Sequence, residues 1–350
     1  MDRRARSDLD QRRSRITRRS GSAEAVEFFN VLTSAELLET TEASLPVHRE
    51  RLYPPTVTLS MFMRQTLEAD ATCQKAVNGW AAQRAADGLG ACSVPTGGYC
   101  RARQRLPLEM VSALTRRTGR LLGQKARTHW LWRGRTVKLV DGTGLSMPDT
   151  PENQAVYPQP ATRPQWMTQE QCENAPDEIV LRECKVSHQV LVTTLLDHRR
   201  VSKDDLRQLY ARRWNVELDL RNLKTTTGMD VLRCQTPQMN DKQLWVHLLA
   251  YNVIRLLMAQ AASNADVDPR NLSFKHTVQL WTQWVACGLS AMHDSGRLFA
   301  LIAQCQVGHR PGRIEPRMRK RRPKPYPWLK TARAHARRQV QRHGHAWATK

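Results

Sequence analysis

The sequence is poor in acidic residues. Its 350 residues include 32 Asp and Glu against 55 Lys and Arg, so the formal net charge at pH 7 is +23. Residues 1–22 hold eight Arg and three Asp, and residues 310–350 hold fourteen Lys or Arg and one Glu. Such ends suit a polyanion, because Lys and Arg contact phosphates and release counterions. A tail that binds ribosomes or an anionic membrane would have the same composition.

Paired cysteines and an N-terminal apolar run are also missing. The eight cysteines contain no C-x-x-C pair, which favours reduced thiols over a zinc site. No apolar segment follows the first charged residues, so no signal peptide is expected. The most apolar helix, near residues 244–262, includes a His, an Asn and an Arg and is expected to be buried rather than to span a membrane. We expect a cytoplasmic, nucleoid-associated protein with no small-molecule substrate.

Four regions are predicted along the chain. Residues 1–22 are expected to be a disordered basic arm, because they are rich in Arg and Ser and almost free of large apolar groups. Residues 23–130 have a helical pattern and are predicted to be a DNA-binding domain. Residues 131–308 are expected to form the core. Residues 309–350 form a basic tail whose spaced prolines favour an extended arm.

A Gly-rich turn precedes an Arg-rich helix within the second region. The segment SVPTGGYCRARQRLPLEMV places Arg101, Arg103 and Arg105 after two glycines, with Thr96 as a candidate cap. A helix whose electropositive N-terminus is followed by several Arg suits DNA binding. The alternative is an ordinary solvated surface helix.

The stretch SKDDLRQLYARRWNVELDLRNLKTTTGMD, residues 202–230, has the boundaries of a helix. Ser202 followed by Asp205 three residues later predicts a capping box, and Gly228 can adopt the left-handed C-terminal position. The preceding run, residues 190–196, is β-branched and apolar, as expected for a buried strand. The local order predicted is therefore strand, turn and helix.

Four unlike polar residues share one face of this helix. At about 3.6 residues per turn, Tyr210, Arg213, Glu217 and Lys224 lie within a narrow sector. A solvated face stabilised by ion pairs is the simpler interpretation of such charges. The mixture of an aromatic residue, two cations and a carboxylate favours a functional site.

A strand and turn are predicted upstream, in TVKLVDGTGLSM, residues 136–147. The apolar residues favour a strand that ends at Asp141, and Gly142 to Gly144 supply a turn into a second strand. An isolated Asp-Gly of this kind is often only a hairpin turn.

The spacing Tyr-x₂-Arg-x₃-Glu-x₆-Lys resembles the signature of a large class of DDE-type bacterial insertion-sequence transposases. Three further segments are similar to that class and occur in the expected order: VDGTGLSMPDTPENQ, WVHLLAYNVIRLLMAQ and RPGRIEPR. The resemblance implies an α/β fold with a ribonuclease H-like core, together with C-terminal helices. It also implies that the protein binds DNA, both the transposon ends and the target. A homodimer in a synaptic complex is implied as well.

The resemblance also assigns roles to residues of the signature. Asp141 and Glu217 are expected to be catalytic carboxylates and ligands of Mg²⁺ or Mn²⁺, since two-metal phosphoryl transfer uses hard oxygen ligands. Arg213 and Lys224 are expected to contact phosphates, and Tyr210 to stack on a base or hydrogen-bond the backbone. The Arg-rich helix is expected to contact the transposon end.

The second catalytic aspartate of the class has no counterpart. Only 76 positions separate Asp141 from Glu217, and no carboxylate between them has the matching context. An internal deletion with a junction near residues 160–164 would explain the shortage of core strands. The chain is then a transposase whose strand cleavage is impaired. The alternatives are a non-catalytic DNA-binding protein that regulates an intact transposase, or a non-functional fragment.

Overall fold

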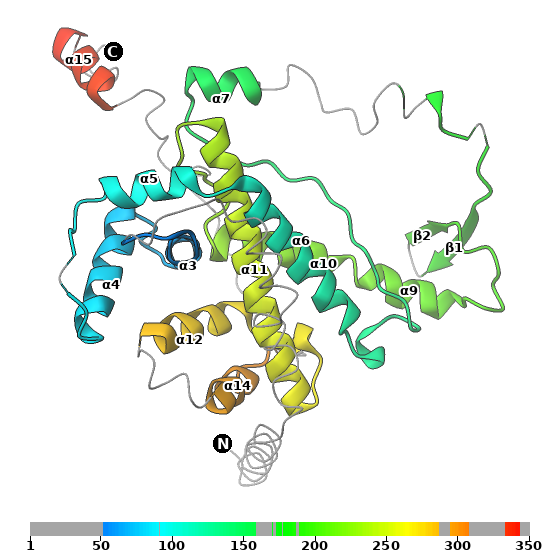
Figure 1. Cartoon of the computed structure of the whole chain (residues 1–350). Coiled ribbons are helices and arrows are strands. Elements are labelled where there is room, and N and C mark those ends of the chain that lie inside the picture. Colours follow the sequence, from blue (N-terminus) through cyan, green and yellow to red (C-terminus); the bar gives the residue numbers. More distant parts are fainter. Residues whose placement is uncertain are drawn as a thin grey trace.

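The protein is mostly helical, with one two-stranded sheet (Figure 1). A computed structural model describes residues 52–90, 92–158, 170, 173–176, 178–186, 189–286, 295–307 and 333–343. The α-helices are α3 Pro55–Leu67, α4 Cys73–Ala86, α5 Gly97–Arg105, α6 Leu108–Gln124, α7 Pro151–Val156, α9 Lys203–Ala211, α10 Trp214–Arg221, α11 Pro237–Ala265, α12 Phe274–Ala286, α14 Ser295–Gln304 and α15 Arg333–His343. The strands are β1 Arg182–Val186 and β2 Gln189–Thr193, with 3₁₀ turns η3 Thr128–Trp130 and η5 Pro269–Asn271 and a π-helical turn η4 Asn222–Thr226.

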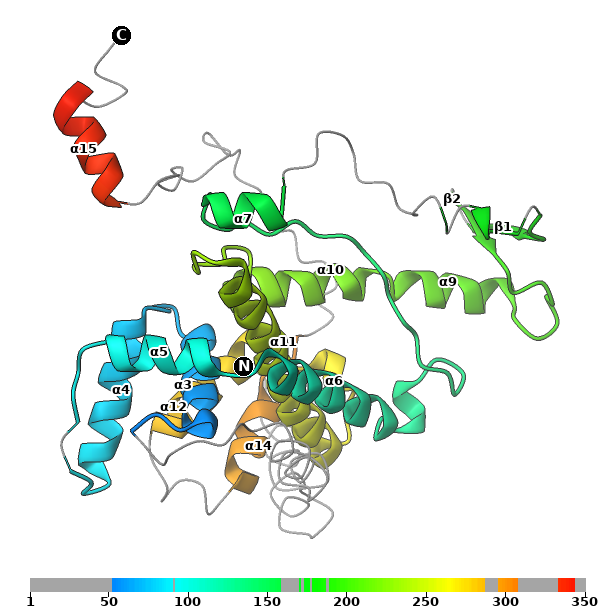
Figure 2. The same ribbon diagram turned by 45° about the horizontal axis from the view of Figure 1, so that its top comes forward.

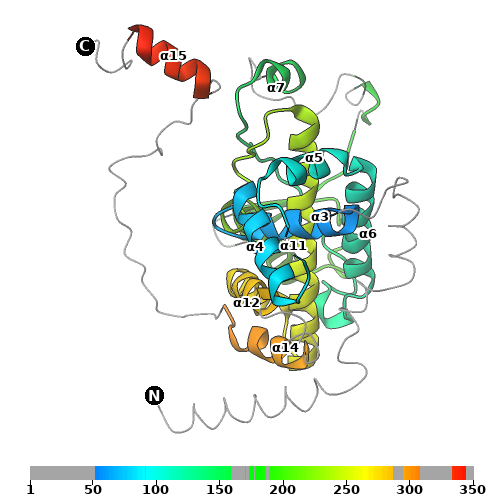
Figure 3. The ribbon, with the colours of Figure 1, turned by 60° about the vertical axis from the view of Figure 1, so that its left-hand side comes forward.

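Helix α11 runs through the middle of the helical part, and α3, α6, α12 and α14 pack along it (Figures 1 and 3). It begins with Pro237 in the first turn, where the missing amide hydrogen costs nothing, and ends at Asp266 in a left-handed conformation. Helices α3 and α6 share one apolar cluster with it, and α12 and α14 share a second. The two clusters make α11 the axis of the core.

The burial of α11 confirms the expectation of a core helix. By length and composition α11 could cross a membrane, but 67% of its most apolar window lies inside the protein. Helices α12 and α14 also occur where helices were expected. Both pack on α11.

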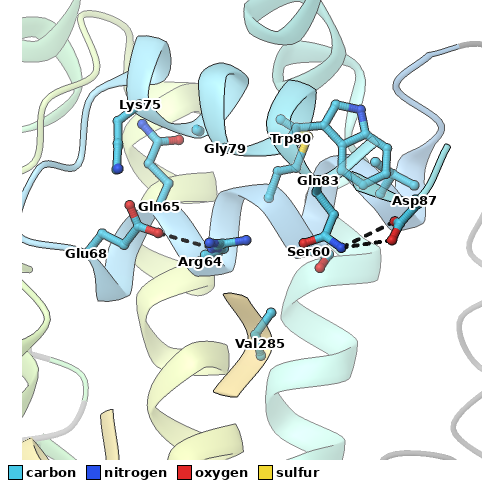
Figure 4. A pocket seen from close by; sticks show the side chains of 13 residues that line it. Ser60, Arg64, Gln65, Glu68, Lys75, Gly79, Trp80, Gln83, Asp87 and Val285 are labelled. Carbon is cyan, nitrogen blue, oxygen red and sulfur yellow. Dashed lines mark hydrogen bonds and ion pairs between the residues drawn. The ribbon is translucent and has the colours of Figure 1, made fainter. Parts of the chain in front are cut away.

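Helices α3, α4 and α5 form a small unit around buried Met61, Val77 and Tyr99. A cavity of about 280 Å³ lies between α3 and α4, with Trp80 in its wall (Figure 4). The helical pattern predicted for the N-terminal region is thus observed from α3 onward. Predictions for residues 1–51, for the junction at 160–164 and for residues 308–332 of the tail region fall outside the described residues.

The antiparallel pair β1–β2 is covered on one face only. Leu191 is buried against Val201 and Leu206, which follow it in the chain. Val190 and Val192 point to the other face and are 58% and 55% exposed. The strand predicted at residues 190–196 is therefore observed over β2, but the described part of the chain leaves Val190 and Val192 uncovered.

A ribonuclease H-like sheet is not observed among the described residues. The predicted strand before Asp141 is extended without a ladder, and Val140 is 92% exposed. Further along, Ser146 makes one isolated parallel bridge to Val231. A strand is stable only when a neighbour pairs with its backbone groups, and the described part of the chain supplies none here. The described part of the chain is mostly helical with one hairpin, and the α/β fold with a ribonuclease H-like core stays a prediction.

Candidate functional site

The signature residues lie on α9, on α10 with its N-cap Arg213, and on the following turn η4, and α9 and α10 run nearly in line (Figure 2). The capping box predicted at the start is present: the Ser202 hydroxyl accepts from the Asp205 amide, and the Asp205 carboxylate accepts from the Ser202 amide. Hydrogen bonds from Ser202, and then from Arg133, lower the pKa of Asp205. Arg212 and Arg213 interrupt the α-helix but keep right-handed helical angles. The signature therefore stays on one nearly continuous rod.

Three of the four signature residues meet at the junction of α9 and α10. The Arg213 guanidinium lies 5.4 Å from the ring centre of Tyr210 and 3.8 Å from Glu217 Oε1. It also lies 5.2 Å from the ring centre of Trp214. Tyr210 is 40% and Trp214 57% exposed. This surface joins aromatic faces to a cation, which is the combination that stacks on bases and holds phosphates.

Lys224 connects the signature to the loop that carries Asp141. Its Nζ donates to Thr143 Oγ1 at 3.1 Å and to the Gly144 carbonyl at 2.8 Å. The chain beyond that loop is fixed as well, because the Ser146 amide donates to the Asp230 carbonyl at 2.9 Å. The Asp141 loop thus lies beside the signature rod, although the two segments are about eighty residues apart in sequence.

The turn after Lys224 confirms another expectation. Gly228 has φ +72°, the left-handed conformation predicted for it. The five residues before Thr227 form η4, and buried Leu223 and Met229 flank the turn. Both contribute to an apolar cluster with Leu145, so the turn and the Asp141 loop share one small core.

Asp219 ties α10 to the helical core. Its carboxylate accepts from Arg255, from the Tyr251 hydroxyl at 2.8 Å and from Arg270 at 2.6 and 2.8 Å. Burial raises the pKa of Tyr251 to about 12, so its hydroxyl keeps the proton that it donates. Glu217, two positions away, is left exposed on another side of the helix.

The carboxylates present do not fit a site for two divalent cations. Asp141 accepts a hydrogen bond from the Gly142 amide at 2.8 Å, and Glu217 faces Arg213. Both supply the oxygen ligands that Mg²⁺ and Mn²⁺ prefer. Among the described residues, however, no three His, Cys, Asp or Glu side chains gather in a way that could hold a metal ion. A pair of cations needs more carboxylate oxygens than these two residues bring.

The Arg-rich helix is present as α5, but its three Arg side chains have different environments. Arg101 and Arg105 are exposed. Arg103 is only 7% exposed, lies 3.8 Å over the Phe62 ring, and donates to Cys73 and Cys234. The prediction that Arg103 contacts DNA is therefore corrected, because in this structure it packs the helical unit against the segment after the signature. Thr96 precedes α5 but makes no side-chain cap.

All six described cysteines are free. Two of them, Cys73 and Cys234, accept from the buried Arg103 guanidinium. Burial raises the pKa of Cys234, so its thiol stays protonated at neutral pH.

Sequence reasoning missed three residues that shape the site. Thr143 receives Lys224, Asp219 fixes α10, and Trp214 extends the aromatic surface. Of these, only Trp214 had a readable signal, since an exposed Trp beside an Arg is unusual on a helix. The partners of Thr143 and Asp219 are 81 and 32 to 51 residues away in sequence, which no local pattern reveals.

Removing the Lys224 amine should loosen the Asp141 loop. Lys224→Ala deletes both hydrogen bonds to that loop, which together are worth about 1 kcal/mol at an exposed site. We expect hydrogen exchange at the bonded amides of Ser146 and Leu232 to become about five times faster. Arg221→Ala removes an exposed cation from the same rod and is expected to leave these rates unchanged. Equal rates in the two variants would show that Lys224 does not hold the loop.

Comparison with known proteins gives two matches and one absence. Residues 97–253 match a family described as "Transposase DDE domain". The Escherichia coli (strain K12) protein named "Transposase InsG for insertion sequence element IS4" is 31% identical over 156 residues. That alignment covers 42% of this chain and 35% of the relative, so the chain spans about a third of the curated protein that it matches. No solved structure matches. The resemblance read from the signature is confirmed.

Proposed function

We propose that this chain, whose central part belongs to the transposase DDE-domain family, is a transposase of an IS4-type insertion sequence with impaired strand cleavage. The observation that carries the proposal is the placement of the Asp141 loop against the signature rod by Lys224. This contact joins the two segments that carry the catalytic carboxylates in the resemblance. The family match covers both segments.

The proposed partner is DNA, both at the transposon ends and at the target site. Exposed Tyr210, Arg213 and Trp214 offer stacking and a cation on one side of the rod. Arg101 and Arg105 add exposed cations on α5. The net charge of +23 favours phosphate contacts of any sequence. A homodimer in a synaptic complex and association with the nucleoid belong to the same proposal.

Impairment is supported by what surrounds the two carboxylates. Asp141 and Glu217 remain the proposed ligands of Mg²⁺ or Mn²⁺, but they do not provide for a pair of cations. The face of β1–β2 that the described residues leave uncovered also supports impairment, because Val190 and Val192 would normally pack against further structure. We attribute both features to an internal deletion in a ribonuclease H-like ancestor.

The test is cleavage of a supercoiled plasmid that bears the ends of the element. With Mg²⁺ or Mn²⁺ we expect no nicking or joining above the background of protein-free plasmid, because two carboxylates do not neutralise two cations. Asp141→Ala and Glu217→Ala are the matched variants. Cleavage that either variant abolishes would contradict impairment, and Asp177 and Asp197 would then be mutated in turn to find the missing ligand.

A non-catalytic regulator is the second candidate, and the shortage of carboxylate ligands among the described residues favours it. Such a protein would occupy the ends or enter mixed multimers with an intact transposase. The discriminating experiment adds this chain to an active relative in a transposition assay. Inhibition that persists in the Glu217→Ala variant would identify a regulator, since that variant keeps the DNA-binding surfaces.

A further inference from the structure

A second pocket is lined by the turn that follows Lys224. It has a volume of about 750 Å³ and is bounded by the α3–α4 connection, residues 225–231, α11 and α12. We call it the Thr225 pocket. Its walls include the hydroxyl-bearing residues of the π-helical turn, and π-turns are frequent at functional sites. The space is large enough for a nucleotide, and none of the roles assigned above uses it.

Cations without an ion-pair partner line the Thr225 pocket. Lys75, Arg233 and Lys275 are all exposed, and within the described ranges no ion pair is recorded for them. The pocket also contains Arg64 and Glu68, which neutralise each other at 3.0 Å. Asp70 is a further carboxylate in the wall, and its Oδ1 accepts from a backbone amide. The net charge of the side chains that line the pocket is therefore positive, as required for an anionic ligand.

A buried neutral histidine belongs to the wall of the pocket. His247, in the pocket wall, is 3% exposed, and its Nε2 has no hydrogen-bond partner. Its Nδ1 lies 3.3 Å from Thr227 Oγ1, which already donates to the Leu223 carbonyl. Nδ1 therefore donates, and Nε2 is left as an acceptor. Burial, together with the charge of Arg233, lowers the pKa of His247 to about 4, so the ring is neutral at neutral pH.

We propose that the Thr225 pocket binds one nucleotide of a DNA strand that passes the signature rod. The cations hold its phosphate, and the hydroxyl-bearing residues of the π-helical turn line the space for its sugar and base. The turn from Lys224 to Gly228 then has the Asp141 loop on one side and the strand on the other. This inference rests on the proposed function in that the strand is DNA, and it adds a site that neither of the two carboxylates lines.

The experiment measures binding of a short fluorescein-labelled single strand and of the matching duplex to the full chain by anisotropy at several salt concentrations. The double variant Arg233→Gln with Lys275→Gln is compared with Lys185→Gln with Lys203→Gln, two exposed lysines outside the pocket. We expect the pocket variant to bind the single strand at least about tenfold more weakly at 0.1 M salt than the control variant. Its salt slope should be smaller by about 0.7 per cation. Lys275→Gln alone, an exposed change on α12, should give about half of this slope change if the double variant folds poorly.

The outcomes separate the two proposals. If the unmodified chain binds DNA and the pocket and control variants bind alike, the pocket inference fails and the proposed function stands. If the unmodified chain binds no DNA, both fail. Deoxyadenosine monophosphate is added as a competitor to distinguish a strand from a free nucleotide. Competition by the mononucleotide at the same phosphate concentration as the strand would overturn the assignment to a strand.

Discussion

Replacing Asp219 with Asn is expected to lower the free energy of unfolding by about 3 kcal/mol. The carboxylate accepts from three side chains, Arg255, Arg270 and Tyr251, and its own side chain is 22% exposed. Removing one member of a partly buried ionic network leaves the charges of the others uncompensated, which is the costly step. The amide keeps the shape of Asp219 but replaces one acceptor oxygen with a donor that faces two guanidinium groups.

Most of the expected loss in the free energy of unfolding comes from Arg255. Its side chain is 13% exposed and lies against the rings of Tyr251 and Phe274, so it cannot reach water without disturbing the core around α11. Arg270 is 44% exposed and can turn into solvent. The predicted loss is therefore closer to that of one buried charge than of two.

Urea unfolding of the two variants Asp219→Asn and Asp204→Asn measures the effect. Asp204 is 76% exposed on α9 and faces Arg207 at 3.6 Å, so its replacement should change the free energy of unfolding by less than about 1 kcal/mol. A shift in the urea midpoint with an unchanged slope identifies a loss of stability. Equal midpoints for the two variants would mean that the network around Asp219 contributes nothing.

The local features of the signature segment could be predicted because their causes are local. The capping box at Ser202 and the left-handed Gly228 depend on residues within one turn. The buried helix α11 follows from a long apolar pattern, which also depends on neighbours along the chain. Each of these was read correctly from the sequence.

The features that failed depend on partners distant in sequence. Apolar residues before Asp141 predicted a strand, but a strand needs a paired neighbour, and Val140 is exposed instead. Arg103 was expected on the surface because Arg is usually solvated, yet Phe62, Cys73 and Cys234 surround it. Exposure of an Arg is decided by what the fold brings to it, and spacing along a helix does not contain that information.

In the candidate site too, local arrangements were predicted and contacts between distant segments were not. The sequence placed Tyr210, Arg213 and Glu217 together, since they lie within two turns of each other, and the structure brings them into contact. The sequence also predicted that Lys224 contacts phosphates, whereas in the structure its amine donates hydrogen bonds to the Asp141 loop. That contact can be exchanged for a phosphate, because both hydrogen bonds are exposed. The proposal for Lys224 therefore includes a change of partner when DNA binds.

Deleting residues 310–350 is expected to weaken DNA binding at least a hundredfold at 0.1 M salt. The segment holds fourteen Lys or Arg and one Glu, which is more than half of the net charge of the chain. Its helix α15 carries exposed Arg338 and Arg342. Each phosphate contact changes the salt slope by about 0.9 on duplex DNA, so losing even a few contacts produces this effect.

The loss should be the same for duplexes with and without the ends of the element, because phosphate contacts carry no sequence information. Anisotropy titrations with both duplexes, at several salt concentrations, measure it. Deleting residues 1–22, which hold eight Arg and three Asp, is the matched control and should give a smaller fall in slope in proportion to its lower charge. A deletion of residues 310–350 that weakens binding only to the ends would assign sequence recognition to the tail. Because α5 would then no longer be needed as the reader of the ends, that result would contradict the role proposed for Arg101 and Arg105.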